Sequence, residues 1–211
     1  MVRKIRPTME EYLGESAIRY EKRRGLKRIK VKTTLIALDL LNLPKGSYIL
    51  DVGCGSGWST EVIKSYGYKV VGIDVSEEMI KIAREKGYDV ELMDMRNMKF
   101  EDSKFDGIIS ISALNFVAEG CKNEEEIEIN YKAAAKEMYR VLRSGGKAVI
   151  EYYPKTKKEE EISMKAFLFA GFSGELIKNS YKKKRGQRFL NLIKGEKPVN
   201  HLFIKYRSYR F

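Results

Sequence analysis

The chain has 211 residues, 43% of them hydrophobic, which is enough for one α/β domain with a sizeable core and too few for two full domains. The two cysteines, Cys54 and Cys121, are far apart in sequence and there is one histidine, so neither a disulfide framework nor a metal site is expected. The sequence has no signal-peptide pattern and no membrane-spanning run, and we therefore expect a cytoplasmic protein.

The net charge of +12 is concentrated at the two ends of the chain. Residues 1–32 carry eleven Lys and Arg against four Glu, and residues 178–211 carry eleven against one, whereas residues 33–177 carry nineteen against twenty-four acidic residues. Segregated positive charge favours a surface that binds a polyanion. The alternative is a pair of solvated basic tails.

A helical segment is predicted first, over residues 10–43, because Ile29, Ile36 and Leu40 recur at helical spacing. Strands are then predicted at residues 48–52, 69–75, 90–95, 105–112, 147–153, 172–181 and 189–194, and helices at 58–66, 76–87, 123–142 and 158–170. This alternation predicts a mostly parallel sheet covered by helices on both faces. We expect a single domain with an N-terminal helical extension (1–46), an α/β core (47–195) and a short basic and aromatic tail (196–211).

A glycine-rich loop follows the first predicted strand and opens the next helix. Asp51 lies two residues before Gly53, and Gly55 and Gly57 complete a GxGxG spacing. Glycines let the backbone turn tightly and approach a ligand, although a plain tight turn is the alternative. A dinucleotide fingerprint, GxGxxG, would need glycine where this chain has Trp58, so a dinucleotide is disfavoured.

Polar side chains also end the next three predicted strands. Asp74 ends the second strand, where a carboxylate can accept both hydroxyls of a ribose. Asp94 and Met95 end the third, where a carboxylate can accept an adenine amino group while a thioether packs on the ring. Ser110 ends the fourth strand beside them. Because these strand ends line one crevice of an open sheet, they predict a nucleoside-binding site.

This constellation resembles the class I methyltransferases, which use S-adenosylmethionine. The resemblance implies a Rossmann-like sheet of seven strands, mostly parallel, with the last strand antiparallel. It also implies that Asp51 and the backbone of Ser110 hold the methionine part of the cofactor. Tyr20, Cys54 and Val75 complete the expected cofactor site.

The acceptor is indicated mainly by what the chain lacks. Methylation of an exocyclic amine usually involves an Asn/Asp-Pro-Pro-aromatic motif after the fourth strand, which is absent here. Methylation of pyrimidine C5 needs a nucleophilic cysteine, and neither Cys54 nor Cys121 has a supporting motif; the Lys-Asp-Lys-Glu set usual for ribose 2′-O is not found either. Guanine N7 has a free lone pair and no proton to lose, so its methylation requires no general base. These absences favour N7 and leave open the alternative of another RNA base, as in transfer RNA, or a small molecule.

Longer matches make the resemblance more specific. Over roughly residues 12–195 the chain resembles the guanine-N7 methyltransferases of small-subunit ribosomal RNA in eukaryotes and their archaeal relatives. The matching segments are residues 19–20, 37–44, 50–57, 72–76, 94–95, 105–113 and 170–174. The chain departs from the family at Asn115 and Phe116, where Gln-Trp is usual, at residues 23–26, where Asn-x-Arg-Met is usual, and in lacking the long basic tail of the eukaryotic members. The resemblance implies a role in ribosome biogenesis.

Asn115 and Phe116 are predicted to line the acceptor pocket because they follow the fourth strand beside the expected methyl group. Phe116 would stack on a flipped base and Asn115 would bond its edge; the alternative is that Phe116 belongs to the core. Two basic stretches are expected to bind RNA. They include Arg23, Arg24, Lys182, Lys183, Lys184, Arg185 and Arg188.

The family also works with a small zinc-binding activator protein that pairs with the edge strand of the methyltransferase sheet. Here that strand runs from Val90 to Met95, which is apolar and lacks the Lys or Pro that protect free edges. The alternative is that a loop covers this edge.

Two other classes of function stay open. A small-molecule methyltransferase would use the same core, but it would need a lid over its substrate and not a polycationic surface. A non-catalytic RNA-binding module would keep the fold only as a scaffold, which the intact set of acids and glycines at the strand ends disfavours.

Overall fold

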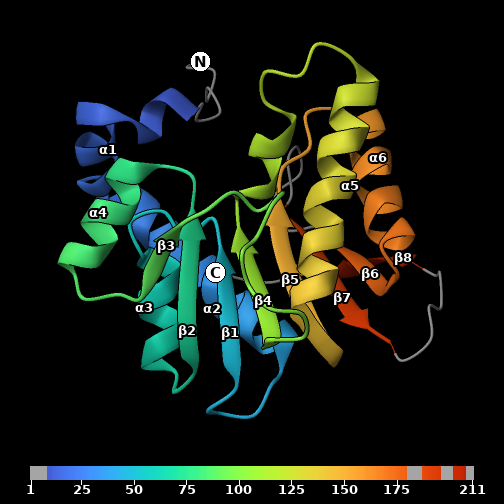
Figure 1. The fold of residues 1–211 in the computed structure, drawn as a ribbon, viewed down its shortest axis with the longest axis horizontal. Helices are drawn as coiled ribbons and strands as arrows, with labels where there is room; N and C mark the ends of the chain where they lie inside the picture. Colours follow the sequence, from blue (N-terminus) through green and yellow to red (C-terminus); the bar gives the residue numbers. More distant parts are fainter. Residues whose placement is uncertain (1–8, 180–186, 196–201, 208–211) are drawn as a thin grey trace.

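A computed structural model describes residues 9–179, 187–195 and 202–207, and its strands form one eight-stranded sheet (Figure 1). The strands are β1 (Tyr48–Val52), β2 (Lys69–Asp74), β3 (Val90–Leu92), β4 (Phe105–Ile111), β5 (Leu142–Tyr152), β6 (Phe172–Asn179), β7 (Arg188–Lys194) and β8 (Leu202–Arg207). Their order is β3-β2-β1-β4-β5-β7-β6-β8. The first five strands of the chain pair in parallel, and β7 is antiparallel to both β5 and β6, as expected for a class I methyltransferase sheet.

Helices cover both faces of this sheet (Figure 1). The described helices are α1 (Gly14–Glu21), α2 (Arg24–Leu41), α3 (Trp58–Ser65), α4 (Glu77–Glu85), α5 (Glu124–Val141) and α6 (Lys157–Phe169), with the 3₁₀ turns η1 (Met9–Tyr12) and η2 (Leu114–Ala118). Helices α2 and α3 pack on one face, and α5 and α6 pack on the other. Within the described residues no helix is long and apolar enough to cross a membrane.

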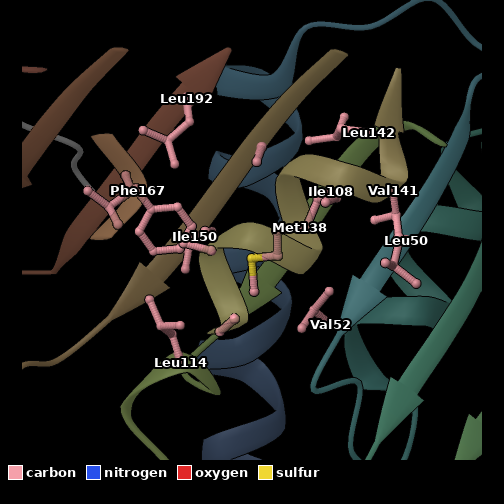
Figure 2. Close-up of a cluster of buried hydrophobic side chains, with 14 of the residues drawn as sticks. Leu50, Val52, Ile108, Leu114, Met138, Val141, Leu142, Ile150, Phe167 and Leu192 are labelled. Carbon is pink, nitrogen blue, oxygen red and sulfur yellow. The ribbon is translucent and has the colours of Figure 1, made fainter. Parts of the chain in front are cut away.

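The alternation of side chains along the central strands explains this double cover. In β4, Ile108 belongs to the core beneath α5 and α6, whereas Ile109 packs with α2 and α3 on the other face. Both residues are fully buried, as expected for a parallel strand covered on both sides. Figure 2 shows Met138 of α5 among Ile108 and Ile150 from the sheet. The continuous apolar runs of the sequence therefore predict these strands correctly.

The helical segment predicted over residues 10–43 is divided in the structure. The backbone leaves the helical conformation at Arg23, which separates α1 from α2. Helix α2 ends at Asn42, whose left-handed backbone (φ 43°) lets its N–H donate to the Leu38 carbonyl. The division allows α1 to lie beside α4 while α2 packs on the sheet.

Strand β8 was not predicted, since residues 196–211 were expected to form a tail. Leu202–Arg207 instead pairs in parallel with β6, in the register Gly174 to Leu202 through Asn179 to Arg207. Without this strand β6 would be an edge with unpaired backbone groups. The apolar and aromatic residues of the run are a strand signal that the basic character of the C-terminal region obscured.

Two predicted strand lengths also change. β3 ends at Leu92, three residues before the predicted end at Met95, because a turn in which Asn97 donates to the Asp94 carbonyl follows it. β5 begins directly after α5 at Leu142, and its register with β4 is irregular before Lys147. Both differences lie at strand ends, where sequence patterns locate boundaries poorly.

Candidate cofactor site

A cavity lies at the carboxyl ends of β1, β2 and β4, where an open α/β sheet binds its ligands. Its wall combines strand-end loops with residues from the N-terminal segment. The lining residues are Met9, Tyr12, Tyr20, Lys30, Gly53, Cys54, Gly55, Ser56, Trp58, Ser59, Ile73, Asp74, Val75, Met93, Met95, Ile111, Ser112, Ala113 and Phe116.

The glycine loop has no room for a side chain at Gly53. Gly53 has φ 74°, and a Cβ atom there would lie 2.1 Å from the Cβ of Ala113. The backbone N–H groups of Gly53 and Cys54 both donate to the Ile73 carbonyl, at 2.7 and 2.9 Å. The loop is thus bound to the end of β2 while its open side faces the cavity. Because burial raises the pKa of the Cys54 thiol well above its usual value, this cysteine stays protonated at neutral pH and is a poor nucleophile.

Asp74 connects the loop to the end of β2. One carboxylate oxygen accepts the Gly55 N–H at 2.8 Å, and the other accepts the Ser76 N–H at 2.9 Å. Burial raises the pKa of Asp74, and these backbone N–H donors oppose the shift. An ionised carboxylate has about four acceptor positions, so Asp74 retains capacity for further donors.

Asp51 is fully buried at the end of β1, directly behind the cavity wall. Its Oδ2 accepts from the hydroxyls of Ser59 and Thr60, both at 2.7 Å, whereas Oδ1 has no hydrogen-bond partner among the described residues. Burial raises the pKa of Asp51 to about 6, although the two hydroxyl donors oppose the shift. A buried acceptor without a donor is costly, and it suits a ligand that supplies one.

Aromatic residues of the N-terminal segment cover the cavity. Tyr20 of α1 stacks on Trp58, with ring centroids 5.0 Å apart, and it also contacts Tyr12 at 4.8 Å. Tyr12 meets Phe116 edge to face at 5.4 Å. Phe116 comes from η2, after β4, so these contacts connect the N-terminal cover with the predicted acceptor loop.

A few side-chain hydrogen bonds hold this cover in place. The Ser76 hydroxyl donates to the Tyr12 carbonyl at 2.6 Å, and the Gly14 N–H donates to Glu78 at 3.1 Å. Glu21 accepts from the Trp58 indole N–H at 3.0 Å and forms an ion pair with Lys86. The cover is therefore attached to α3 and α4, which begin at the glycine loop and after β2.

Most of the predicted cofactor residues lie at this cavity. Those that line it are Tyr20, Gly53, Cys54, Gly55, Asp74, Val75 and Met95, together with the predicted acceptor residue Phe116. Three others support the wall without lining it. They are Asp51, Gly57, which precedes the first residue of α3, and Ser110, whose buried hydroxyl has no described partner.

Two predicted site residues have other partners. The Asp94 carboxylate pairs with Arg96 at 2.6 Å and does not line the cavity; burial raises the pKa of this carboxyl, but Arg96 outweighs it and the net shift is downward. Asn115 also lies outside the lining, and its side-chain oxygen accepts the backbone N–H of Tyr153. In this conformation neither residue is directed to a ligand in the cavity.

The predicted RNA-binding residues are described only in part. Arg23 and Arg24 are exposed at the start of α2. Arg188 begins β7 opposite Tyr152 and forms an ion pair with Glu160. Lys182, Lys183, Lys184 and Arg185 lie outside the described residues. The amide of Gln187, which directly precedes β7, donates to Thr33 of α2 at 2.8 Å.

Sequence reasoning missed the part of the wall that comes from the N-terminal segment. Met9, Tyr12 and Lys30 line the cavity from more than twenty residues before the glycine loop. No motif connects these residues to the strand ends, because their approach depends on how η1 and α2 pack. Trp58 could have been predicted as a lining residue from the sequence, since it directly follows the glycine loop.

The residues present fit S-adenosylmethionine. Asp74 offers free acceptor positions to ribose hydroxyls, and Val75, Met93 and Met95 offer an apolar surface to an adenine ring. The unpartnered oxygen of Asp51 fits the ammonium group of the amino-acid part. The chemistry of this donor and acceptor set is thus complementary to the cofactor along its length.

The fold and this site define a class I methyltransferase that depends on S-adenosylmethionine. Residues 50–150 match the family model described as methyltransferase domain. The 18S rRNA (guanine-N7)-methyltransferase of Schizosaccharomyces pombe is 33% identical over 195 residues, covering 90% of this chain and 73% of that protein. The chain belongs to the 18S rRNA (guanine-N7)-methyltransferase family.

Solved structures agree with the fold. The TehB-like methyltransferase of Corynebacterium glutamicum is similar with a TM-score of 0.62 and 20% identity, over 85% of this chain and 98% of that one. A Haloferax volcanii structure, a complex that contains the Trm112 methyltransferase activator, is similar with a TM-score of 0.63 and 17% identity, over 82% and 93% of the two chains.

Proposed function

We propose that this enzyme transfers a methyl group from S-adenosylmethionine to N7 of a guanine in small-subunit ribosomal RNA, in the cytoplasm and during ribosome assembly. The observation that carries this proposal is the 33% identity to an 18S rRNA (guanine-N7)-methyltransferase, which extends over 90% of the chain. The match is therefore much longer than residues 50–150, which match the common methyltransferase domain.

The cavity chemistry supports an acceptor that loses no proton. Among the described lining residues the one carboxylate is Asp74, and it already accepts two backbone N–H groups. Guanine N7 attacks with a lone pair and requires no general base, whereas acceptors with a proton to lose benefit from one. Positioning of the base is then the main catalytic contribution of the protein.

Each part of the cavity has a proposed task. When bound, S-adenosylmethionine supplies an electrophilic methyl group. Asp74 holds the ribose hydroxyls, and Asp51 holds the ammonium group. Phe116 lies at the cavity wall after β4, where its ring can stack on the target base. Asn115 would contact the base only after releasing the Tyr153 N–H.

We also propose that a small zinc-binding activator protein docks on the free edge of the sheet. β3 is the outermost strand beside β2, and its Leu92 side chain is about half exposed, with 51% of its surface accessible. The Val90 carbonyl accepts two hydrogen bonds from the Arg84 guanidinium, at 3.2 and 3.3 Å. A strand of the activator that pairs with β3 would therefore displace Arg84 from the Val90 carbonyl, or it would pair with the later residues of β3, toward Leu92.

Mapping of N7-methylguanosine in ribosomal RNA tests the proposed reaction. Purified small-subunit RNA from a strain that lacks this protein would be incubated with the enzyme, the cofactor and, in parallel, the activator. Mass spectrometry of nuclease fragments should then show a gain of one methyl group at a guanine, and at limiting cofactor an Asp74→Ala enzyme should produce much less of it. A methyl group on another base or on transfer RNA, with none on small-subunit RNA, would contradict the proposal.

A further inference from the structure

Lys30 is a basic residue whose position no part of the methyl-transfer chemistry above explains. It lies in α2 and lines the cavity, whereas Arg24 and Arg28 of the same helix are exposed. Its ammonium group donates to the carbonyl of Ile111 at 2.7 Å, which places it at the carboxyl end of β4. An ammonium group has three donors, and this hydrogen bond uses one of them.

The surroundings of Lys30 are acidic and sheltered from water. Burial lowers its pKa, and the carboxylates of Glu151, Asp51 and Asp74 act in the opposite direction. None of the three forms an ion pair with Lys30 among the described residues. Glu151 accepts instead from the Ser112 hydroxyl at 2.6 Å. Asp74 accepts the two backbone N–H groups at the glycine loop and β2.

We infer that Lys30 binds the carboxylate of the cofactor's amino-acid part, so that Lys30 and Asp51 together recognise a zwitterion. Among the described residues, Lys30 is a donor without an acidic partner within ion-pair distance, and Asp51 has a buried acceptor oxygen without a donor. Lys30 lines the cavity at the carboxyl end of β4, and Asp51 lies behind the wall near the end of β1, where it accepts from the lining residue Ser59. An α-amino acid presents one carboxylate and one ammonium group on the same carbon, which matches this pair in charge and number.

The energetics favour a ligand over a purely structural role. A sheltered charge without a counter-ion costs free energy, and a ligand that supplies the counter-ion recovers it on binding. A charge-assisted hydrogen bond contributes about 1.5–3 kcal/mol, which corresponds to roughly 10- to 100-fold in affinity. The inference rests on the cofactor site proposed above and is independent of which acceptor is methylated.

The competing role for Lys30 is to anchor α2 to the end of β4. In that case its removal would disturb the whole cavity and weaken every ligand equally. The two roles differ in one respect: only a carboxylate-binding lysine distinguishes ligands that have the carboxylate from those that lack it.

Titration calorimetry with two ligands separates the roles. The ligands are S-adenosylhomocysteine and its decarboxylated derivative, which keeps the ammonium group and the nucleoside. Lys30→Met keeps most of the aliphatic side chain and removes the charge. We expect it to weaken S-adenosylhomocysteine by about 10- to 100-fold and the decarboxylated derivative by no more than about twofold. Lys30→Arg should restore part of the discrimination between the two ligands.

Lys27→Met is the matched control, because Lys27 lies one turn earlier in α2 and pairs with Glu61 at 2.9 Å, away from the cavity lining. Its affinities should equal those of the parent. Equal weakening of both ligands by Lys30→Met, with an unchanged ratio, would overturn the inference and assign Lys30 the structural role. Failure of the parent protein to bind either ligand would overturn the cofactor site itself, so the two failures are distinguishable.

Discussion

The cofactor cavity has two sides that are built in different ways. The floor consists of strand-end residues such as Gly53, Gly55 and Asp74, which backbone hydrogen bonds connect directly to the sheet. The cover consists of Tyr12 and Tyr20 with other N-terminal residues, which aromatic contacts and single side-chain hydrogen bonds hold in place.

This difference predicts which substitutions should change the stability of the fold and which should change mainly cofactor binding. The floor is part of the central sheet, so a change there affects folding and cofactor affinity together. The cover contacts the sheet mainly through side chains, so a change there should affect binding with a smaller effect on folding. Lys30 also belongs to the cover, because it comes from helix α2 and not from a strand end, and it contacts the sheet through its side chain.

The largest expected effect comes from Gly53→Ala in the floor. The new methyl group would lie 2.1 Å from the Cβ of Ala113, at a backbone φ of 74°. Left-handed strain of about 1–2 kcal/mol and overpacking of about 1–3 kcal/mol should together lower the free energy of unfolding by about 3 kcal/mol. Urea denaturation measures this change.

Gly120→Ala is a close control for that experiment. Gly120 has φ 79° and no atom within 4 Å of the added Cβ, so it isolates the backbone strain from the steric clash. It should lower the free energy of unfolding by only about 1 kcal/mol. Equal destabilisation by the two variants would show that the glycine loop is not packed against the acceptor loop.

Asp74→Ala should produce the next largest effect, on cofactor affinity. The ribose hydroxyls would lose a charged acceptor, which is worth about 1–3 kcal/mol, or roughly 5- to 150-fold. Asp94→Ala is the informative comparison, since Asp94 pairs with Arg96 and does not line the cavity. We expect it to change affinity for S-adenosylhomocysteine by less than about threefold. A large loss in Asp94→Ala would show that the Arg96 pair opens to bind the adenine.

The same contrast explains what the sequence predicts and what it does not. The floor of the cavity can be predicted from local patterns, because a glycine spacing and an acid at a strand end indicate a ligand site in any sheet of this kind. The cover has no such pattern: Tyr12 and Lys30 reach the cavity only through the packing of η1 and α2. β8 was missed for a different reason: its apolar and aromatic residues are a strand signal, but the basic character of the C-terminal region obscured it, and only the structure shows its pairing with β6.

A smaller effect is expected from pH, acting through Asp51. Its pKa is raised to about 6, and the ammonium group of the cofactor favours the ionised form. Binding below pH 6 must therefore remove a proton from Asp51, and affinity should fall about tenfold between pH 7 and pH 5. Burial also raises the pKa of Asp74, which acts in the same direction.

Asp51→Asn separates the two carboxylates, because it removes one titration and leaves Asp74 in place. Calorimetry with S-adenosylhomocysteine between pH 5 and pH 7 should show a flatter profile for this variant than for the parent. Identical profiles would assign the pH dependence to Asp74 and remove Asp51 from the ammonium site.

The smallest change is expected at the outer surface, where the cover meets the predicted RNA path. Arg23 and Arg24 are exposed. If each neutralises one phosphate of single-stranded RNA, replacing both with serine should reduce the slope of log affinity against log salt by about 1.4 units. Serines at Lys182, Lys183, Lys184 and Arg185 should flatten it by about two to three units, from a parental slope of roughly −4.

Neither set should alter cofactor affinity, because none of its described residues lines the cavity. A matched control replaces four exposed lysines from the acidic middle of the chain, namely Lys64, Lys69, Lys81 and Lys136. This control has the same loss of net charge as the quadruple variant, so it distinguishes a local phosphate contact from a general electrostatic effect. If it flattened the filter-binding slope as much as the quadruple variant, the basic ends would act only through net charge. A parental slope near zero would remove nucleic-acid binding by these residues and favour a small-molecule acceptor.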